Sequence, residues 1–206
     1  MRLVSALLLF AILLVASFGS TLLANENEAN NDNQVSQVVE RMNTQFLMTI
    51  GDHFNVPYED VADVIDLGIS NDDLSVVFFV ADKANVPAMK VAMQRLSGEN
   101  WYQVYHALGL KSSHFYVQLD AKKDKRLFRR LSGLHKGQWT NDLVLRNKEV
   151  INLVNISVMN DVFPDNATAI ASGRALGESF AYLHFKSVAK QAYDHKIELA
   201  AEMDEE

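Results

Sequence analysis

Few residues of this sequence stand in the patterns that catalysis or metal binding requires. There is no cysteine, and no serine occupies the Gly-x-Ser-x-Gly pattern of a nucleophile elbow. No two of the six histidines are three or four residues apart, the spacing that places two side chains on one helix face. These histidines are His53, His106, His114, His135, His184 and His195. The sequence therefore predicts no catalytic nucleophile, no metal site and no cofactor.

Paired carboxylates are the remaining catalytic possibility. Glycoside hydrolysis uses two carboxyl groups on either side of the scissile bond, and such a pair could be assembled from Glu59, Asp60, Asp63 and Glu99. The chain has 26 acidic residues, so the choice of a pair is unconstrained. Most acids in such positions cap helices or lie in solvent. An envelope enzyme acting on cell-wall glycan is therefore the alternative hypothesis, and the sequence favours a role without catalysis.

Two groups of side chains suit binding. Trp101 and Tyr105 share one face of the short predicted helix "WYQVYHAL", where they either anchor the core or contact a partner. Positive charge gathers in the segment "DAKKDKRLFRRL", which is either a solvated loop or a docking site for an acidic partner or for anionic lipid head groups. The expected partner surface comprises Lys122, Lys123, Lys125, Arg126, Arg129, Arg130, Trp101 and Tyr105.

The three prolines mark the elements that would position these side chains. Two segments share one pattern, in which proline opens a short helix and glycine ends it: "NVPYEDVADVIDLG" at 55–68 and "NVPAMKVAMQRLSG" at 85–98. The same pattern follows Pro164. A second helix follows each glycine, so helix–turn–helix units are expected near 55–84, 85–110 and 162–187. A period near thirty residues is typical of helical repeats.

These units predict an all-α fold of stacked helical hairpins, either a compact bundle or a short repeat array. The segment between the second and third units is less regular. Within it, "SSHFYVQL" alternates polar and apolar residues enough to allow a short extended segment near 112–119.

The second unit resembles a segment of predicted exported bacterial proteins without an established function, in which the pattern "GVSxEEVxxLRxxGxGWxEIxxxLGL" recurs. The matching positions in 85–110 are Val86, Val91, Arg95, Gly98, Trp101, Val104, Leu108 and Gly109. The chain departs from the pattern at Asn55 and Asn85, which stand where glycine is usual. Asparagine tolerates the left-handed conformation better than most residues. The resemblance implies an exported helical protein and supplies no catalytic residues.

The ends of the chain indicate export. Residues 1–24 have the form of a signal peptide, with an early arginine, an apolar run and small residues. Cleavage is expected after Ala24, with Gly19 as the second choice and an uncleaved anchor as the alternative. Residues 25–34 are expected to form a disordered acidic spacer, 35–200 a single helical domain and 201–206 an acidic tail. A cysteine-free exported protein suits a periplasmic or cell-envelope location.

The net charge limits the partners. At −7 it argues against nucleic acid, which requires a basic surface. The leading hypothesis is therefore a non-catalytic exported interaction or scaffolding module that binds an acidic protein or an anionic envelope polymer, with peripheral membrane contact as a further possibility.

Overall fold

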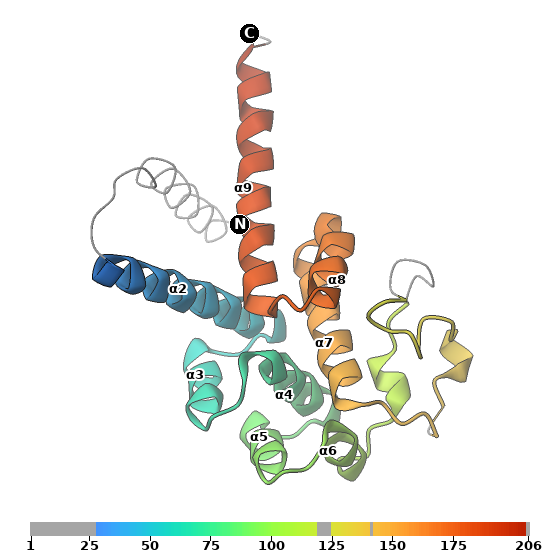
Figure 1. The fold of residues 1–206 in the computed structure, drawn as a ribbon. Helices are drawn as coiled ribbons and strands as arrows, with labels where there is room; N and C mark the ends of the chain where they lie inside the picture. Colours follow the sequence, from blue (N-terminus) through green and yellow to red (C-terminus); the bar gives the residue numbers. More distant parts are fainter. Residues whose placement is uncertain (1–27, 119–124, 141, 205–206) are drawn as a thin grey trace. The chain divides into compact units, whose positions relative to one another are not determined.

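The computed structural model describes residues 28–118, 125–140 and 142–204, and these residues confirm the predicted all-α class. No strand forms among them, and their helices pack against one another (Figure 1). Within the same residues, no helix combines the length and the apolar character needed to cross a bilayer. The predicted signal peptide, residues 1–24, lies outside the described part of the chain.

The described helices divide into two compact units. The larger unit comprises residues 43–183. The smaller combines the part of α2 (Glu28–Phe54) up to Met42 with the part of α9 (Phe180–Asp204) from His184 onward. The larger unit holds every cavity and polar cluster described below.

Helix pairs occupy each of the three predicted repeat positions. α3 (Tyr58–Asp66) precedes α4 (Asn71–Ala84), and α5 (Ala88–Leu96) precedes α6 (Trp101–Ala107). The third pair begins with the 3-10 turn η3 (Pro164–Asn166) and α8 (Ala167–Ala175), and α9 follows. The proline therefore precedes or opens the first helical segment in all three pairs.

Left-handed residues end the helices where the sequence analysis placed them. Asn55 and Asn85 have φ of 53° and 52°, so asparagine does supply the conformation for which glycine is usual. Gly68, Gly98 and Gly177 have φ of 96°, 96° and 97° between the two helices of a pair. Two residues after each glycine, a polar side chain accepts a backbone N–H of the next helix. These acceptors are Ser70, Asn100 and Ser179.

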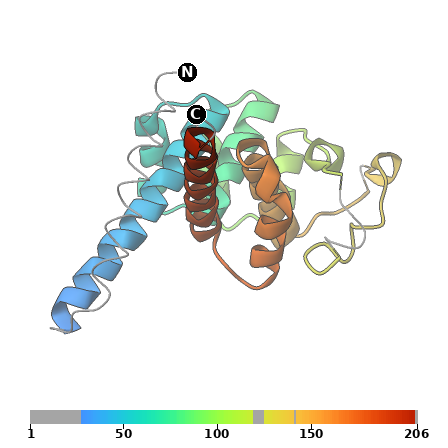
Figure 2. The ribbon, with the colours of Figure 1, turned by 90° about the horizontal axis from the view of Figure 1, so that it is seen from above.

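α7 (Asn147–Val162) forms the centre of the larger unit, where it packs against α4, α8 and α6 (Figures 1 and 2). Its residues Asn152 to Ile156 are all buried, so the helix has no exposed face in this stretch. A helix buried on every side is held by packing rather than by its own propensity.

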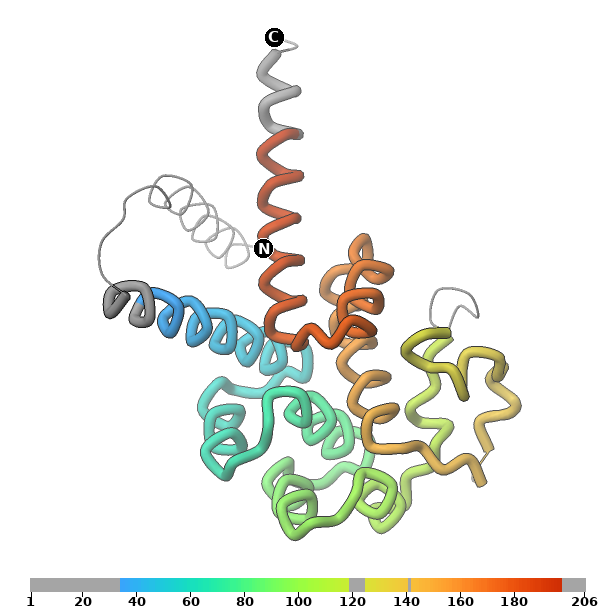
Figure 3. The backbone as a smooth tube through the Cα atoms, in the orientation of Figure 1, coloured from blue at the N-terminus to red at the C-terminus, as the bar shows by residue number. Residues whose placement is uncertain are grey.

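The described parts of the segment between α6 and α7 follow an irregular path (Figure 3), and aromatic and aliphatic side chains anchor them. Its described parts include two 3-10 turns, η1 (Ser112–Phe115) and η2 (Lys136–Gln138). Phe128, Leu131 and Trp139 are buried. The extended segment expected near 112–119 does not form over Ser112–Phe115, because this stretch turns to bury Phe115 against Tyr105. Residue 119 lies outside the described residues.

Two expectations about the chain ends differ from the structure. Residues 28–34, expected in the disordered spacer, belong to α2, and residues 201–204 of the expected acidic tail belong to α9. Once a helix is nucleated, each added residue forms one hydrogen bond for one residue fixed, so extending a helix over polar flanks is much easier than starting one. Residues 25–27 and 205–206 lie outside the described part.

Candidate functional site

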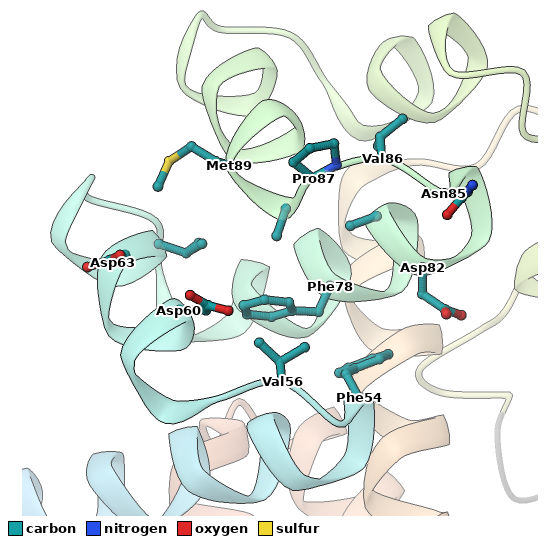
Figure 4. A pocket seen from close by; sticks show the side chains of 13 residues that line it. Phe54, Val56, Asp60, Asp63, Phe78, Asp82, Asn85, Val86, Pro87 and Met89 are labelled. Atoms are coloured by element: carbon teal, nitrogen blue, oxygen red, sulfur yellow. The ribbon is translucent and has the colours of Figure 1, made fainter.

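An open groove of about 640 Å³ lies between α3, α4 and α5 of the larger unit (Figure 4). Apolar side chains form most of its lining, with Phe78 of α4 between Val56 on one side and Met89 on the other (Figure 4). Phe78 and Val64 are buried, and Val56 is half-buried. These apolar side chains form the floor of the groove, and aspartates share the surface that the groove presents to solvent. The full lining is Phe54, Val56, Asp60, Asp63, Val64, Phe78, Ala81, Asp82, Asn85, Val86, Pro87, Ala88 and Met89.

All the charged residues that line the groove are aspartates. Asp60 and Asp63 come from α3, three residues apart and hence on neighbouring positions of one face, and Asp82 comes from α4. Asp82 pairs with Lys83 at 3.0 Å. Asp60 and Asp63 are exposed, and their carboxylates make no hydrogen bond or ion pair with any described residue. Two uncompensated carboxylates thus stand beside the apolar floor.

Exposed apolar residues extend the groove along α5. Met89, Met93 and Leu96 follow one another at the i, i+4 and i+7 positions of one helix face. They are 37%, 63% and 46% exposed, respectively. A methionine-rich exposed face is adaptable in shape and is typical of surfaces that bind apolar side chains.

A second acidic pair, at the start of α4, is used inside the fold. Asp72 accepts a hydrogen bond of 2.6 Å from Nη2 of Arg174, and the Nε of the same arginine donates to Asn152 Oδ1 at 3.0 Å. Asn155 of α7 donates to the backbone carbonyl of Asp72 at 2.8 Å. Asp72 therefore joins the first repeat unit to the third and to the central helix α7.

Asp73 joins the first unit to the second in a similar way. Its Oδ1 accepts a hydrogen bond of 2.6 Å from the indole Nε1 of Trp101, and Arg95 Nε lies 3.7 Å from the same oxygen. Arg95 stacks over the Trp101 ring at 5.5 Å. The backbone N–H of Trp101 donates to Asn147 Oδ1, at the start of α7. Both acids of this pair are therefore structural.

This arrangement contradicts the expectation that Trp101 and Tyr105 belong to a partner surface. Trp101 is 0% exposed and Tyr105 1% exposed. Burial raises the pKa of Tyr105 to about 12, which keeps its hydroxyl neutral at any physiological pH. Tyr105 packs against Phe115 at 4.8 Å between ring centroids. Both residues are core anchors.

The predicted basic surface is only partly available. Lys125, Arg126 and Arg129 are exposed. Arg130 instead makes two hydrogen bonds to the buried Glu149 of α7, at 3.1 and 2.6 Å. These bonds raise the pKa of Arg130 and fasten the segment to α7. Arg130 is therefore a structural residue, and Lys122 and Lys123 lie outside the described residues.

The histidines do not form a site. Among the described residues, no three histidine, aspartate or glutamate side chains gather closely enough to hold a metal ion. His53 is 4.0 Å from Asp161 beside a smaller cavity of about 380 Å³. His184 is buried, and burial lowers its pKa to about 4, so it is neutral at physiological pH.

Of the acids considered for glycan chemistry, Asp60 and Asp63 line the groove, whereas Glu59 and Glu99 do not. Two features escaped the sequence analysis: the exposed stripe on α5 and the pairing of Asp72 with Arg174, 102 residues away. The sequence does contain a signal for the pairing of Asp72 with Arg174. The segments "RLSGENW" at 95–101 and "RALGESF" at 174–180 place arginine, glycine, glutamate and an aromatic ring at the same spacing.

Comparisons with known proteins add no relative: no protein-family model, curated protein or solved structure matches this chain.

Proposed function

We propose that the protein is a non-catalytic interaction module of the cell envelope, whose partner docks in the groove between α3, α4 and α5. The observation that carries the proposal is the groove itself, in which apolar side chains lie beside two exposed carboxylates that have no ion-pair partner among the described residues. An exposed apolar surface with a polar rim is typical of binding sites. The exposed basic residues Lys125, Arg126 and Arg129 form a second contact, for an acidic protein or an anionic envelope polymer.

The pairing of polar groups supports binding over catalysis. The arginines and acids that pair with one another hold elements of the fold together, as in the pairs Asp72–Arg174 and Arg130–Glu149. A general acid, in contrast, requires a carboxyl group in an apolar pocket that favours its protonated form. Asp60, Asp63 and Asp82 are all exposed. The groove thus offers contact area and charge without a protected reaction site.

A glycan-cleaving enzyme is the second candidate, because Asp60 and Asp63 both line the groove. Release of reducing sugars from purified cell-wall glycan would support it. Loss of that activity in both Asp60→Asn and Asp63→Asn would assign the pair. Absence of release across a range of pH would leave the interaction module.

Export is part of the proposal, on the strength of the signal-like segment 1–24. We expect the purified protein from the envelope fraction to begin at Asn25, which intact-mass measurement reports directly. A protein that retains residues 1–24 and stays in the cytosol would contradict the location but not the groove.

Site-specific photo-crosslinking in cells tests the proposed function. A benzophenone amino acid at Met93, on the exposed stripe, should give a discrete adduct, whereas one at Leu176, which is 68% exposed and outside the groove, should not. The Met93 adduct should weaken when Asp60 and Asp63 are both changed to asparagine. Absence of any adduct at Met93, or the same adduct at both positions, would overturn the proposal.

A separate set of variants tests the contact made by the exposed basic residues. Reversing the charge of Lys122, Lys123, Arg126 and Arg129 removes the basic surface, while Arg130 is kept because it holds Glu149. Loss of an adduct formed from position 125 would assign this segment to an anionic partner. An unchanged adduct would assign the contact to other residues.

A further inference from the structure

We infer that the groove binds a basic amphipathic helix of a partner protein. This inference rests on the proposed function and specifies the chemistry of its ligand. It is carried by three independent features of the described residues: the apolar floor, the helical spacing of the exposed stripe on α5, and the sign of the charge around both.

The stripe determines the shape of the ligand. Met89, Met93 and Leu96 span two turns of α5, or about 10 Å along its axis. Met89 belongs both to the stripe and to the lining, so the stripe adjoins the groove. A helix that lies in such a surface presents apolar residues at the i, i+3, i+4 and i+7 positions. An added strand is a poorer fit, because the described residues contain no sheet edge to receive it.

The charge determines the polar face of the ligand. The lining contains Asp60, Asp63 and Asp82 and no lysine, arginine or histidine. Asp82 has Lys83 as a partner, and Lys90 is exposed on α5 next to Met89. Asp60 and Asp63 have no ion-pair partner among the described residues, and both belong to α3, whereas Asp82 belongs to α4 (Figure 4). Lysine or arginine on the ligand would complement these two carboxylates.

A second copy of this chain is a poor occupant. The chain carries a net charge of −7, so self-association would bring acidic surfaces together. Its most basic segment, "DKRLFRRL", cannot offer an apolar face, because Phe128 and Leu131 are buried in the fold. The ligand is therefore a helix of another protein.

A synthetic peptide tests the inference with the full chain. The probe is a labelled amphipathic helix of about five turns, with leucine on one face and lysine elsewhere. One comparison peptide has glutamate in place of lysine, and another has the same composition as the probe in an order that breaks the apolar face. Fluorescence anisotropy measures their binding. We expect the lysine helix to bind at least about tenfold more tightly than either comparison peptide.

Matched variants locate the binding. Asp60→Asn with Asp63→Asn should weaken binding of the lysine helix, while Asp142→Asn with Asp165→Asn, the same charge change at exposed positions outside the groove, should not. Met89→Ser with Met93→Ser should also weaken it, whereas Leu176→Ser should have no effect. Equal binding to both aspartate variants, or equal binding of the ordered and scrambled peptides, would overturn the inference.

The peptide and the crosslinking experiments fail separately. A discrete Met93 adduct whose partner segment is acidic, or has no helical apolar spacing, would refute the basic helix and leave the interaction module in place. Absence of any Met93 adduct would refute the module itself.

Discussion

Two pairs of aspartates have opposite roles in this protein, although Asp60 lies only 12 residues before Asp72, and Asp63 only 10 residues before Asp73. Asp72 and Asp73, in the first turn of α4, are bound by side chains from the other two repeat units. The carboxylates of Asp60 and Asp63, on α3, form no hydrogen bond or ion pair with a described residue and line the groove. Since the residue type is the same, position alone decides which carboxylates hold the fold and which remain available to a ligand.

Asp72 and Asp73 also differ from each other in how they are bound. Arg95 and Arg174 each donate to the carbonyl of the glutamate four residues later and stack on an aromatic ring six residues later. Phe180 has no donor, so Arg174 itself bonds to Asp72. Trp101 has an indole N–H that bonds to Asp73, and Arg95 lies further away, at 3.7 Å. The aromatic residue thus decides how closely the arginine approaches the acid.

Removing Arg174 should have the largest effect on stability. Arg174→Ala leaves Asp72 and Asn152 without their partner and strips a cation from the Phe180 ring. We expect a loss of about 3 kcal/mol in the free energy of unfolding, measured with urea. Arg126→Ala, at an exposed position, is the control and should change stability by less than about 0.5 kcal/mol. A similar small value for Arg174→Ala would contradict the structural role of Asp72.

Acid should destabilise the fold through a different residue, the buried His184. Its pKa is about 4 in the folded chain against 6.5 in the reference state, so the unfolded chain binds more protons between these values. Stability is therefore fully present above pH 6.5 and is lost as the pH falls toward 4. We expect a loss of about 2 kcal/mol from this residue between neutral pH and about pH 4.5. In His184→Gln, the pH dependence of urea unfolding over this range should flatten. An unchanged slope would assign the acid sensitivity to other groups.

Trp101→Phe should make the second unit resemble the third. The change removes the indole hydrogen bond to Asp73, and we expect a loss of about 1.5 kcal/mol. Once the indole N–H is removed, the guanidinium of Arg95 is left as the donor nearest to the Asp73 carboxylate, as the guanidinium of Arg174 is for Asp72. Arg95→Ala should consequently destabilise the Trp101→Phe protein more than the wild type in a double-mutant cycle. Additive losses would show that Arg95 and Trp101 act on Asp73 independently.

The sequence predicted well where helices begin and end, because proline and glycine act on the local backbone conformation. Pro57, Pro87, Gly68 and Gly98 impose backbone conformations that depend on no distant residue. The burial of Trp101 could not be decided in the same way. An aromatic residue on a short helix serves a core or a surface equally well until its neighbours are known.

The polar contacts required the tertiary structure. Nothing local to Arg130 distinguishes it from Arg126 and Arg129, yet it alone of the three bonds to Glu149. Likewise, the acids of α3 are read from sequence as helix caps. Only the packing of α3 beside α4 and α5 turns Asp60 and Asp63 into the border of a groove.

The smallest expected effect on stability belongs to the groove. Asp60→Asn with Asp63→Asn should change the free energy of unfolding by less than about 0.5 kcal/mol, because no described side chain depends on either carboxylate. A loss as large as that from Arg174→Ala would mean that these acids are structural after all. Urea unfolding of the double variant beside Asp142→Asn with Asp165→Asn makes the comparison.

The most direct measurement is therefore the affinity of the lysine helix for this same double variant. We expect the Asp60→Asn, Asp63→Asn protein to unfold like the wild type and to bind the peptide at least about tenfold more weakly. Undiminished binding by a fully folded double variant would contradict the assignment of Asp60 and Asp63 to a ligand.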